Sequence, residues 1–256
     1  MSTKHLTDYT LFCPFQKQQT FDVLNVSSLE AITDPHPLCL LAAEELQLHL
    51  KDQQSWNHNF GLTAGSEGAI IGKMFGILVV KTNEGELGYL SAFSGKLAGS
   101  NHHPRFVPPV FDTLKTGDFL NLGMLELSQM SKNIAVLQLN EENCRHEIAV
   151  LKAKRKARSN TLQQQIFEQY HFLNSKGESK SLNELFEKAG YRQPPAGAGE
   201  CAGPKLLQYA FQKKMKALAM AEFWWGQSPK STGWKHGEFY APCREKCVPI
   251  LAHMLS

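Results

Sequence analysis

The sequence lacks long apolar runs, an apolar leader at its N-terminus and a dense cysteine pattern. No stretch approaches the run of about eighteen apolar residues that a transmembrane helix needs. The opening residues MSTKHLTDYT contain no apolar segment typical of a secretion signal. The six cysteines are spread over 256 residues and do not form a disulfide framework. These absences favour a soluble cytoplasmic protein with reduced thiols and no membrane partner.

A strong excess of one charge is also absent. The chain has 27 Lys and Arg against 24 Asp and Glu, so its net charge of +3 does not by itself indicate a nucleic-acid partner. We find no internal repeat and no low-complexity tract. With 42% apolar residues the chain can bury a substantial core, as one large domain or two small ones.

Local patterns predict helices and strands in the first and last parts of the chain. Residues 38–50 are strong helix formers that follow two prolines, which predicts a helix. Residues 73–80 and 87–94 are apolar runs around a polar, glycine-containing turn, which predicts a β-hairpin. Ala217–Trp225 is a short apolar run typical of a buried strand. Residues 1–34 are expected to form an arm with one strand.

The middle of the chain has a helical period. Positions that are apolar except for Glu141 follow a 3-4 spacing there, typical of a coiled-coil seam, at Leu127, Met130, Ile134, Leu137, Glu141, Cys144, Ile148 and Leu151. We expect Arg158–Asn160 to turn the chain into a second helix, and Ser181–Glu184 is a capping-box pattern that opens a short helix. We therefore predict a first part of an α/β domain, a helical-hairpin insertion and the second part of the α/β domain, at residues 1–117, 118–192 and 193–256.

Three cysteines of the last quarter are the strongest candidates for a chemical site. Cys201 follows a glycine- and proline-rich turn and precedes an apolar helix pattern, while Cys243 and Cys247 are four residues apart. Three thiolates can bind zinc tetrahedrally and leave a fourth position for His236 or water. The alternative is that all three are small buried thiols, as cysteines often are. Glu200 is either a proton shuttle beside such a metal or an ordinary helix cap.

One run of the sequence is concentrated in positive charge. It consists of Lys152, Lys154, Arg155, Lys156 and Arg158, and it contains no acidic residue. At the end of a helix such a run can follow the phosphate backbone of RNA. A solvated helix surface explains the same pattern equally well. Both interpretations remain open at this point.

Recognisable motifs occur at His36–Gln47, Trp56–Gly61, Gly72–Gly76, Ala92–His102, Phe106–Asp112 and in the cysteine motifs Pro194–Lys205 and Tyr240–Cys247. In these motifs, which span nearly the whole chain, the sequence resembles the long N-terminal extension of a bacterial subgroup of RluA-type RNA pseudouridine synthases. The resemblance implies an RNA-modifying isomerase that acts on ribosomal or transfer RNA. The catalytic Arg-Leu-Asp motif of that family does not occur in these residues. We therefore expect an accessory region that aids RNA binding and has no catalytic residue of its own.

The expected elements follow the order of a helix, a hairpin, a helix after Cys201, the strand Ala217–Trp225 and a helix around Cys243 to Leu251. This order is similar to that of the zinc-dependent deaminase fold. The similarity implies an α/β fold with a deaminase-like mixed sheet flanked by helices, and a zinc-dependent nucleobase deaminase-like hydrolase as the alternative function. The deaminase pattern places a glutamate two residues after the first ligand, but Gly203 is there. Three residues rather than two separate Cys243 from Cys247. The similarity thus favours the fold more than the activity.

Overall fold

The computed structural model describes residues 11–15, 35–63, 65, 71–114, 119–139, 141–229 and 233–256. Its contacts divide the chain into two compact units, which are described separately. The first unit comprises Met1–Val110 and His171–Ser256, and the second comprises Phe111–Tyr170. Within the described ranges, no helix has the length and apolar character needed to cross a lipid bilayer.

The first unit is a mixed α/β structure built on a five-stranded sheet. Its strands are β1 (Cys13–Pro14), β2 (Lys73–Lys81), β3 (Leu87–Phe93), β6 (Lys216–Trp225) and β7 (Phe239–Tyr240), in the order β1-β3-β2-β6-β7. All four strand pairs are antiparallel, whereas the sequence analysis expects a mixed sheet. Parallel pairing among the described residues is limited to an isolated bridge between Ser91 and Phe106.

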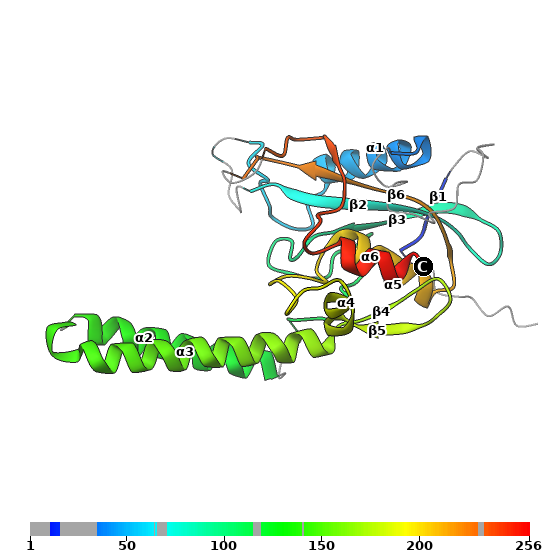
Figure 1. Cartoon of the computed structure of the whole chain (residues 1–256). Helices are drawn as coiled ribbons and strands as arrows, with labels where there is room; N and C mark the ends of the chain where they lie inside the picture. The colour runs from blue at the N-terminus through cyan, green and yellow to red at the C-terminus, as the bar shows by residue number, and fades with distance from the viewer. Residues whose placement is uncertain are drawn as a thin grey trace, which may run out of the picture. The chain divides into compact units, whose positions relative to one another are not determined.

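Helices cover both faces of this sheet (Figure 1). Helix α1 (Pro37–Asp52) packs on β2 and β6 from one side, and α5 (Ala202–Gln212) packs on β2, β3 and β6. Figure 1 places α5, together with α6 (Val248–Met254), on the side opposite α1. The first unit therefore has three layers, with the sheet in the middle.

Successive residues of β2 face opposite sides of the sheet, so alternate residues contact α1 and α5. Phe75 and Ile77 belong to the core cluster that includes Leu46 of α1, so they face that helix. Gly76 faces the other way, where an added Cβ would lie 2.9 Å from both the Ala202 Cβ and the Leu206 Cδ1. Because Gly76 has no side chain, the first turn of α5 can approach the sheet closely.

Several predicted elements are confirmed. The helix expected at 38–50 is α1, which begins with Pro37 and whose N-cap residue His36 accepts the Leu38 N–H at Nδ1, 3.2 Å. The expected hairpin is β2 with β3, and the buried strand is β6. Cys13–Pro14 forms a strand in the N-terminal arm, and the other apolar residues of the arm, Phe21 to Val26, lie outside the described residues.

A small hairpin and a short helix complete the first unit. Strands β4 (His171–Leu173) and β5 (Ser179–Ser181) pair antiparallel, and α4 (Leu182–Lys188) follows directly. The capping box at Ser181 and Glu184 is confirmed, since each side chain bonds the backbone N–H of the other residue. These elements group with the first unit by their contacts, so the second unit ends at Tyr170, before the end expected for the insertion.

The second unit is a pair of helices, α2 (Phe119–Gln138) and α3 (Glu141–Gln169). The bonds that join Glu126 to Arg158 and Ser131 to Arg155 run in opposite directions along the two helices, so the pair is antiparallel. The turn expected at Arg158–Asn160 is wrong, because α3 continues through it and the chain reverses between Gln138 and Glu141. Serine and asparagine tolerate an exposed helical position, and this segment contains no glycine or proline that would end the helix.

Candidate metal centre and basic helix surface

The three cysteines predicted as metal ligands come together at the starts of two helices. Cys201 is the N-cap residue of α5, and Cys247 directly precedes α6. Cys243 lies one turn before Cys247, whose N–H bonds the Cys243 carbonyl at 3.1 Å. The helix expected around Cys243 therefore begins later, at Val248. The three sulfur atoms all lie within 4.8 Å of one another.

This spacing fits a shared metal ion. Two thiolates on a tetrahedral zinc are roughly 3.8 Å apart, because each Zn–S bond is about 2.3 Å long. The Cys243 and Cys247 sulfurs are 3.4 Å apart, and a separation of Cys201 from Cys243 above about 8 Å would have excluded a common ion. The geometry is therefore compatible with zinc on three cysteine ligands.

The fourth ligand does not come from His236. Its Nδ1 accepts the Gly226 N–H at 2.9 Å, and its ring packs on Trp225 with centroids 4.3 Å apart. Among the described residues, no histidine or carboxylate joins the three sulfurs in a ligand group. A water or a substrate atom from the adjoining cavity is left as the candidate for the fourth position.

The three thiols are chemically different from one another. Hydrogen bonds from Cys201, and then from Cys247, stabilise the Cys243 thiolate and lower the pKa of the Cys243 thiol. Hydrogen bonds with Cys201, and then with Cys243, raise the pKa of Cys247, and the hydrogen bond with Cys243 raises the pKa of Cys201. Cys243 is also the most exposed of the three, so it is the first to ionise and the first that a metal from solution meets.

A buried glutamate on β6, which is not among the predicted site residues, lies beside the three cysteines. Glu222 is 5% exposed, and its Oε1 accepts the Gly203 N–H at 2.9 Å. Burial raises the pKa of this carboxyl group to about 7. The sequence does contain a signal for this residue, because Glu222 is the one charged residue inside the apolar run Ala217–Trp225. Glutamate is rarely buried without a specific partner, so its position there indicates a specific role.

Two glycines make room for this carboxylate beside the cysteines. Glu222 is the register partner of Gly76, so both face α5. A Cβ added at Gly203 would lie 3.5 Å from Glu222 Oε1, which means that the carboxylate occupies the space beside the second residue of α5.

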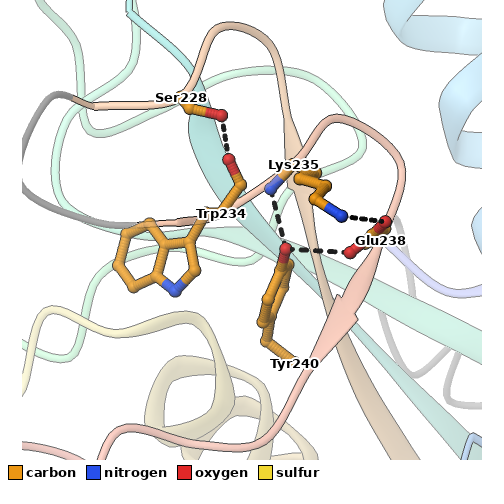
Figure 2. A network of polar contacts seen from close by, with 5 residues as sticks. All are labelled: Ser228, Trp234, Lys235, Glu238 and Tyr240. Atoms are coloured by element: carbon orange, nitrogen blue, oxygen red, sulfur yellow. Dashed lines mark hydrogen bonds and ion pairs between the residues drawn. The ribbon is translucent and has the colours of Figure 1, made fainter.

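A cavity of about 560 Å³ adjoins the cysteines and Glu222. Trp234 lies on its wall, in the loop between β6 and β7. Figure 2 shows how this loop is held: Ser228 Oγ donates to the Trp234 carbonyl, and the Lys235 N–H donates to the Tyr240 hydroxyl at 2.7 Å. These bonds therefore hold Trp234 in the wall of the cavity that adjoins the three cysteines.

Glu200 also lines this cavity. Its carboxylate is close to Lys73 and Lys205, and it is not part of the ligand group that the three cysteines form. Its Oε2 and the Lys73 Nζ both approach the space beside Gly95. Lys205 is 3% exposed and donates to the carbonyls of Phe93 and Gly95 at 2.9 and 3.1 Å. Burial lowers the pKa of Lys205 to about 8, and the charge of Glu200 partly opposes this shift.

The predicted RNA-binding residues lie in the middle of α3, not at a helix end. Lys152, Lys154 and Lys156 are exposed. Arg155 donates through Nε to Ser131 at 2.8 Å, and Arg158 forms a 2.6 Å ion pair with Glu126. The two arginines thus join α3 to α2, and the three lysines carry the positive charge that faces solvent.

Part of this charge surrounds a hollow between the two helices. Its volume is about 440 Å³, and its lining includes Lys152, Arg155, Lys156 and Ser159. Residues 152, 156 and 159 share one side of the helix, because they are three or four positions apart. The hollow therefore concentrates positive potential on one face of the pair.

Comparisons of the chain with protein-family models, with curated proteins and with solved structures found no match.

Proposed function

We propose that this chain is the accessory region of an RNA pseudouridine synthase and that it helps that enzyme to engage ribosomal or transfer RNA. The resemblance in the motifs between His36 and Cys247 motivates the family. The observation that carries the RNA role is that Lys152, Lys154 and Lys156 of α3 are all exposed, with Lys152 and Lys156 on the side that carries the hollow. Each phosphate contact by such a lysine releases counterions, which gives an affinity that falls steeply with salt.

The variant K152S/K154S/K156S tests this role without disturbing the contacts between α2 and α3. We expect weaker binding of a ribosomal RNA fragment at low salt and a smaller dependence of affinity on salt, by roughly 0.7 logarithmic units per lost contact to single-stranded RNA. The control K188S/K235S removes two exposed charges elsewhere and should bind as the wild type does. Equal affinities and equal salt dependences of all three proteins would leave a solvated helix surface as the better interpretation.

The fold proposal that accompanies this function is a deaminase-like α/β unit with a coiled-coil-like hairpin inserted in it. The order helix, hairpin, helix, strand, helix in α1, β2–β3, α5, β6 and α6 supports it. The second unit supports the insertion, because its two helices lie between elements of the first unit in the sequence.

A second candidate function is a zinc-dependent hydrolase of the deaminase type. The observation that favours it is that Glu222 and the three cysteines line one cavity. A zinc ion held by Cys201, Cys243 and Cys247 would supply a Lewis acid and lower the pKa of a bound water. Glu222 holds a proton near neutral pH, since burial raises its pKa to about 7, and so it is suited to general acid–base work.

Ammonia release from a panel of nucleobases and nucleosides distinguishes this candidate. The hydrolase interpretation requires turnover by the zinc-loaded chain and its loss in E222Q with the zinc content unchanged. RNA binding with no turnover of any member of the panel favours the accessory role instead.

A further inference from the structure

A second basic surface lies on the first unit, away from the cysteines. A cavity of about 650 Å³ is lined by Lys176, Lys214 and Lys216, above an apolar floor that includes Phe211 and Leu255. The three lysines are exposed. They come from two segments separated in sequence, the β4–β5 turn and the stretch from the end of α5 to the first residue of β6, so no single run of the sequence reveals them.

A fourth lysine extends this surface. Lys81 at the end of β2 is the register partner of Lys216, and side chains of directly opposite residues share one face of a sheet. Like charges in this arrangement repel each other. None of the four lysines forms an ion pair in the described part of the chain. We call Lys81, Lys176, Lys214 and Lys216 the lysine patch.

The β4–β5 turn that carries Lys176 is held rigidly. Asn174 is 1% exposed, and its Oδ1 accepts the N–H groups of Lys176 and Glu178 at 3.0 and 2.8 Å. Its Nδ2 donates to the Glu178 carboxylate at 2.7 Å. The only acidic side chain of this turn is thereby bonded to the turn itself, and Lys176 projects from a fixed support.

The backbone at Lys214 is of a kind that normally selects glycine. The N–H of Lys214 bonds the Phe211 carbonyl and that of Met215 bonds the Ala210 carbonyl, which together end α5 in a Schellman motif. Lys214 occupies its left-handed position with φ +56°. A lysine here carries a conformational cost that glycine avoids, and such costs are concentrated at functional positions.

We propose that the lysine patch binds phosphate groups of the same RNA that α3 engages, so that the RNA contacts both units of the chain. The proposal rests on the proposed function, because it takes RNA as the partner. Three ammonium groups around one hollow, with Lys81 beside Lys216, match the repeated negative charge of a nucleic-acid backbone. RNA binding also relieves the repulsion between Lys81 and Lys216, because each ammonium group gains a phosphate partner.

The test compares K176S/K214G/K216S with the wild type and with K152S/K154S/K156S, by titration of one labelled ribosomal RNA fragment at several salt concentrations. For the patch variant we expect weaker binding and a salt dependence smaller by roughly 2 logarithmic units, from three lost contacts. The single variant K214G separates binding from folding. Its melting temperature should equal or exceed that of the wild type, since glycine suits this backbone, while its affinity for RNA falls.

The outcomes separate the two proposals. A patch variant with wild-type affinity and salt dependence overturns the patch, whatever the α3 variant does. A loss in the patch variant together with an unaffected α3 variant supports the patch and overturns the role of α3. A wild-type chain that binds no RNA overturns both the role of α3 and that of the lysine patch. If inorganic phosphate at equal molar concentration displaces the RNA, the patch is a site for free anions and not for RNA.

Discussion

At the scale of single residues, Cys243 is the cysteine on which zinc binding at the candidate site would depend most. It is the exposed member of the cluster, and its pKa is lowered by the neighbouring thiols. We expect Cys243→Ser to lose zinc, because a serine hydroxyl is a poor zinc ligand and two thiolates then remain.

Elemental analysis after purification measures this loss directly. Cys144→Ser is the matched control, since Cys144 lies in the second unit outside the sulfur group, and this variant should keep the zinc of the wild type. Equal zinc content in wild type and Cys243→Ser would show that the sulfurs are only packed together.

Glu222 makes the stability of the metal-free chain depend on pH. Burial raises its folded pKa from 4.5 to about 7, so between these values the folded state binds more protons than the unfolded state. The stability associated with Glu222 is therefore present at low pH and is lost as the pH rises through about 7. Its full size is at most about 3 kcal/mol, from 1.36 kcal/mol per pKa unit.

Glu222→Gln should remove this dependence and keep the bond from the Gly203 N–H. We expect the free energy of unfolding of the variant, relative to the wild type, to rise between about pH 5 and about pH 8. Urea unfolding of chelator-treated protein measures it. If the free energy of unfolding of the variant differs from that of the wild type by the same amount at both pH values, Glu222 does not titrate in this range.

At the scale of elements, the approach of α5 to the sheet decides whether the site can form. A Cβ at Gly76 would lie 2.9 Å from the Ala202 Cβ, so Gly76→Ala must push away the turn that carries Cys201. Such overpacking typically costs about 1–3 kcal/mol. Thermal unfolding should show the loss of stability, and metal titration should show weaker zinc binding.

Gly233→Ala is the control for this substitution, because a Cβ there meets no heavy atom within 4 Å. It should leave both stability and zinc binding unchanged. If Gly76→Ala has the stability and zinc binding of the wild type, α5 does not pack against β2 as closely as the structure shows.

The elements that the sequence predicts are those with strong local signals. Pro37 and the helix formers after it define α1, and the polar turn at 82–86 defines the β2–β3 hairpin. The reversal between α2 and α3 was misplaced, because Arg158–Asn160 is polar without containing a residue that ends a helix. The antiparallel course of β6 beside β2 is set by contacts distant in sequence, which no local pattern records.

For the candidate sites, too, the sequence predicts only what a local pattern records. The three cysteines were predicted from residue type and spacing. Glu222 and the lysine patch were not, because they depend on which strand faces α5 and on which turns meet in space. Residues that act together from separate segments become visible only in the folded chain.

At the scale of the whole molecule, we predict that these 256 residues alone form no pseudouridine. The reason is chemical: the resemblance requires an Arg-Leu-Asp motif, whose aspartate attacks the uridine, and the sequence does not contain it. Incubation with unmodified ribosomal RNA and an assay for pseudouridine check this. Any product that depends on the chain would contradict the accessory role.

RNA engagement by the intact chain is the central claim, and a lysine-reactivity footprint tests it most directly. The wild-type chain is acetylated with and without ribosomal RNA, and the modification of each lysine is measured by mass spectrometry. We predict that RNA protects Lys152, Lys154 and Lys156, and leaves the exposed Lys188 and Lys235 reactive. Identical reactivity of all these lysines with and without RNA would contradict it.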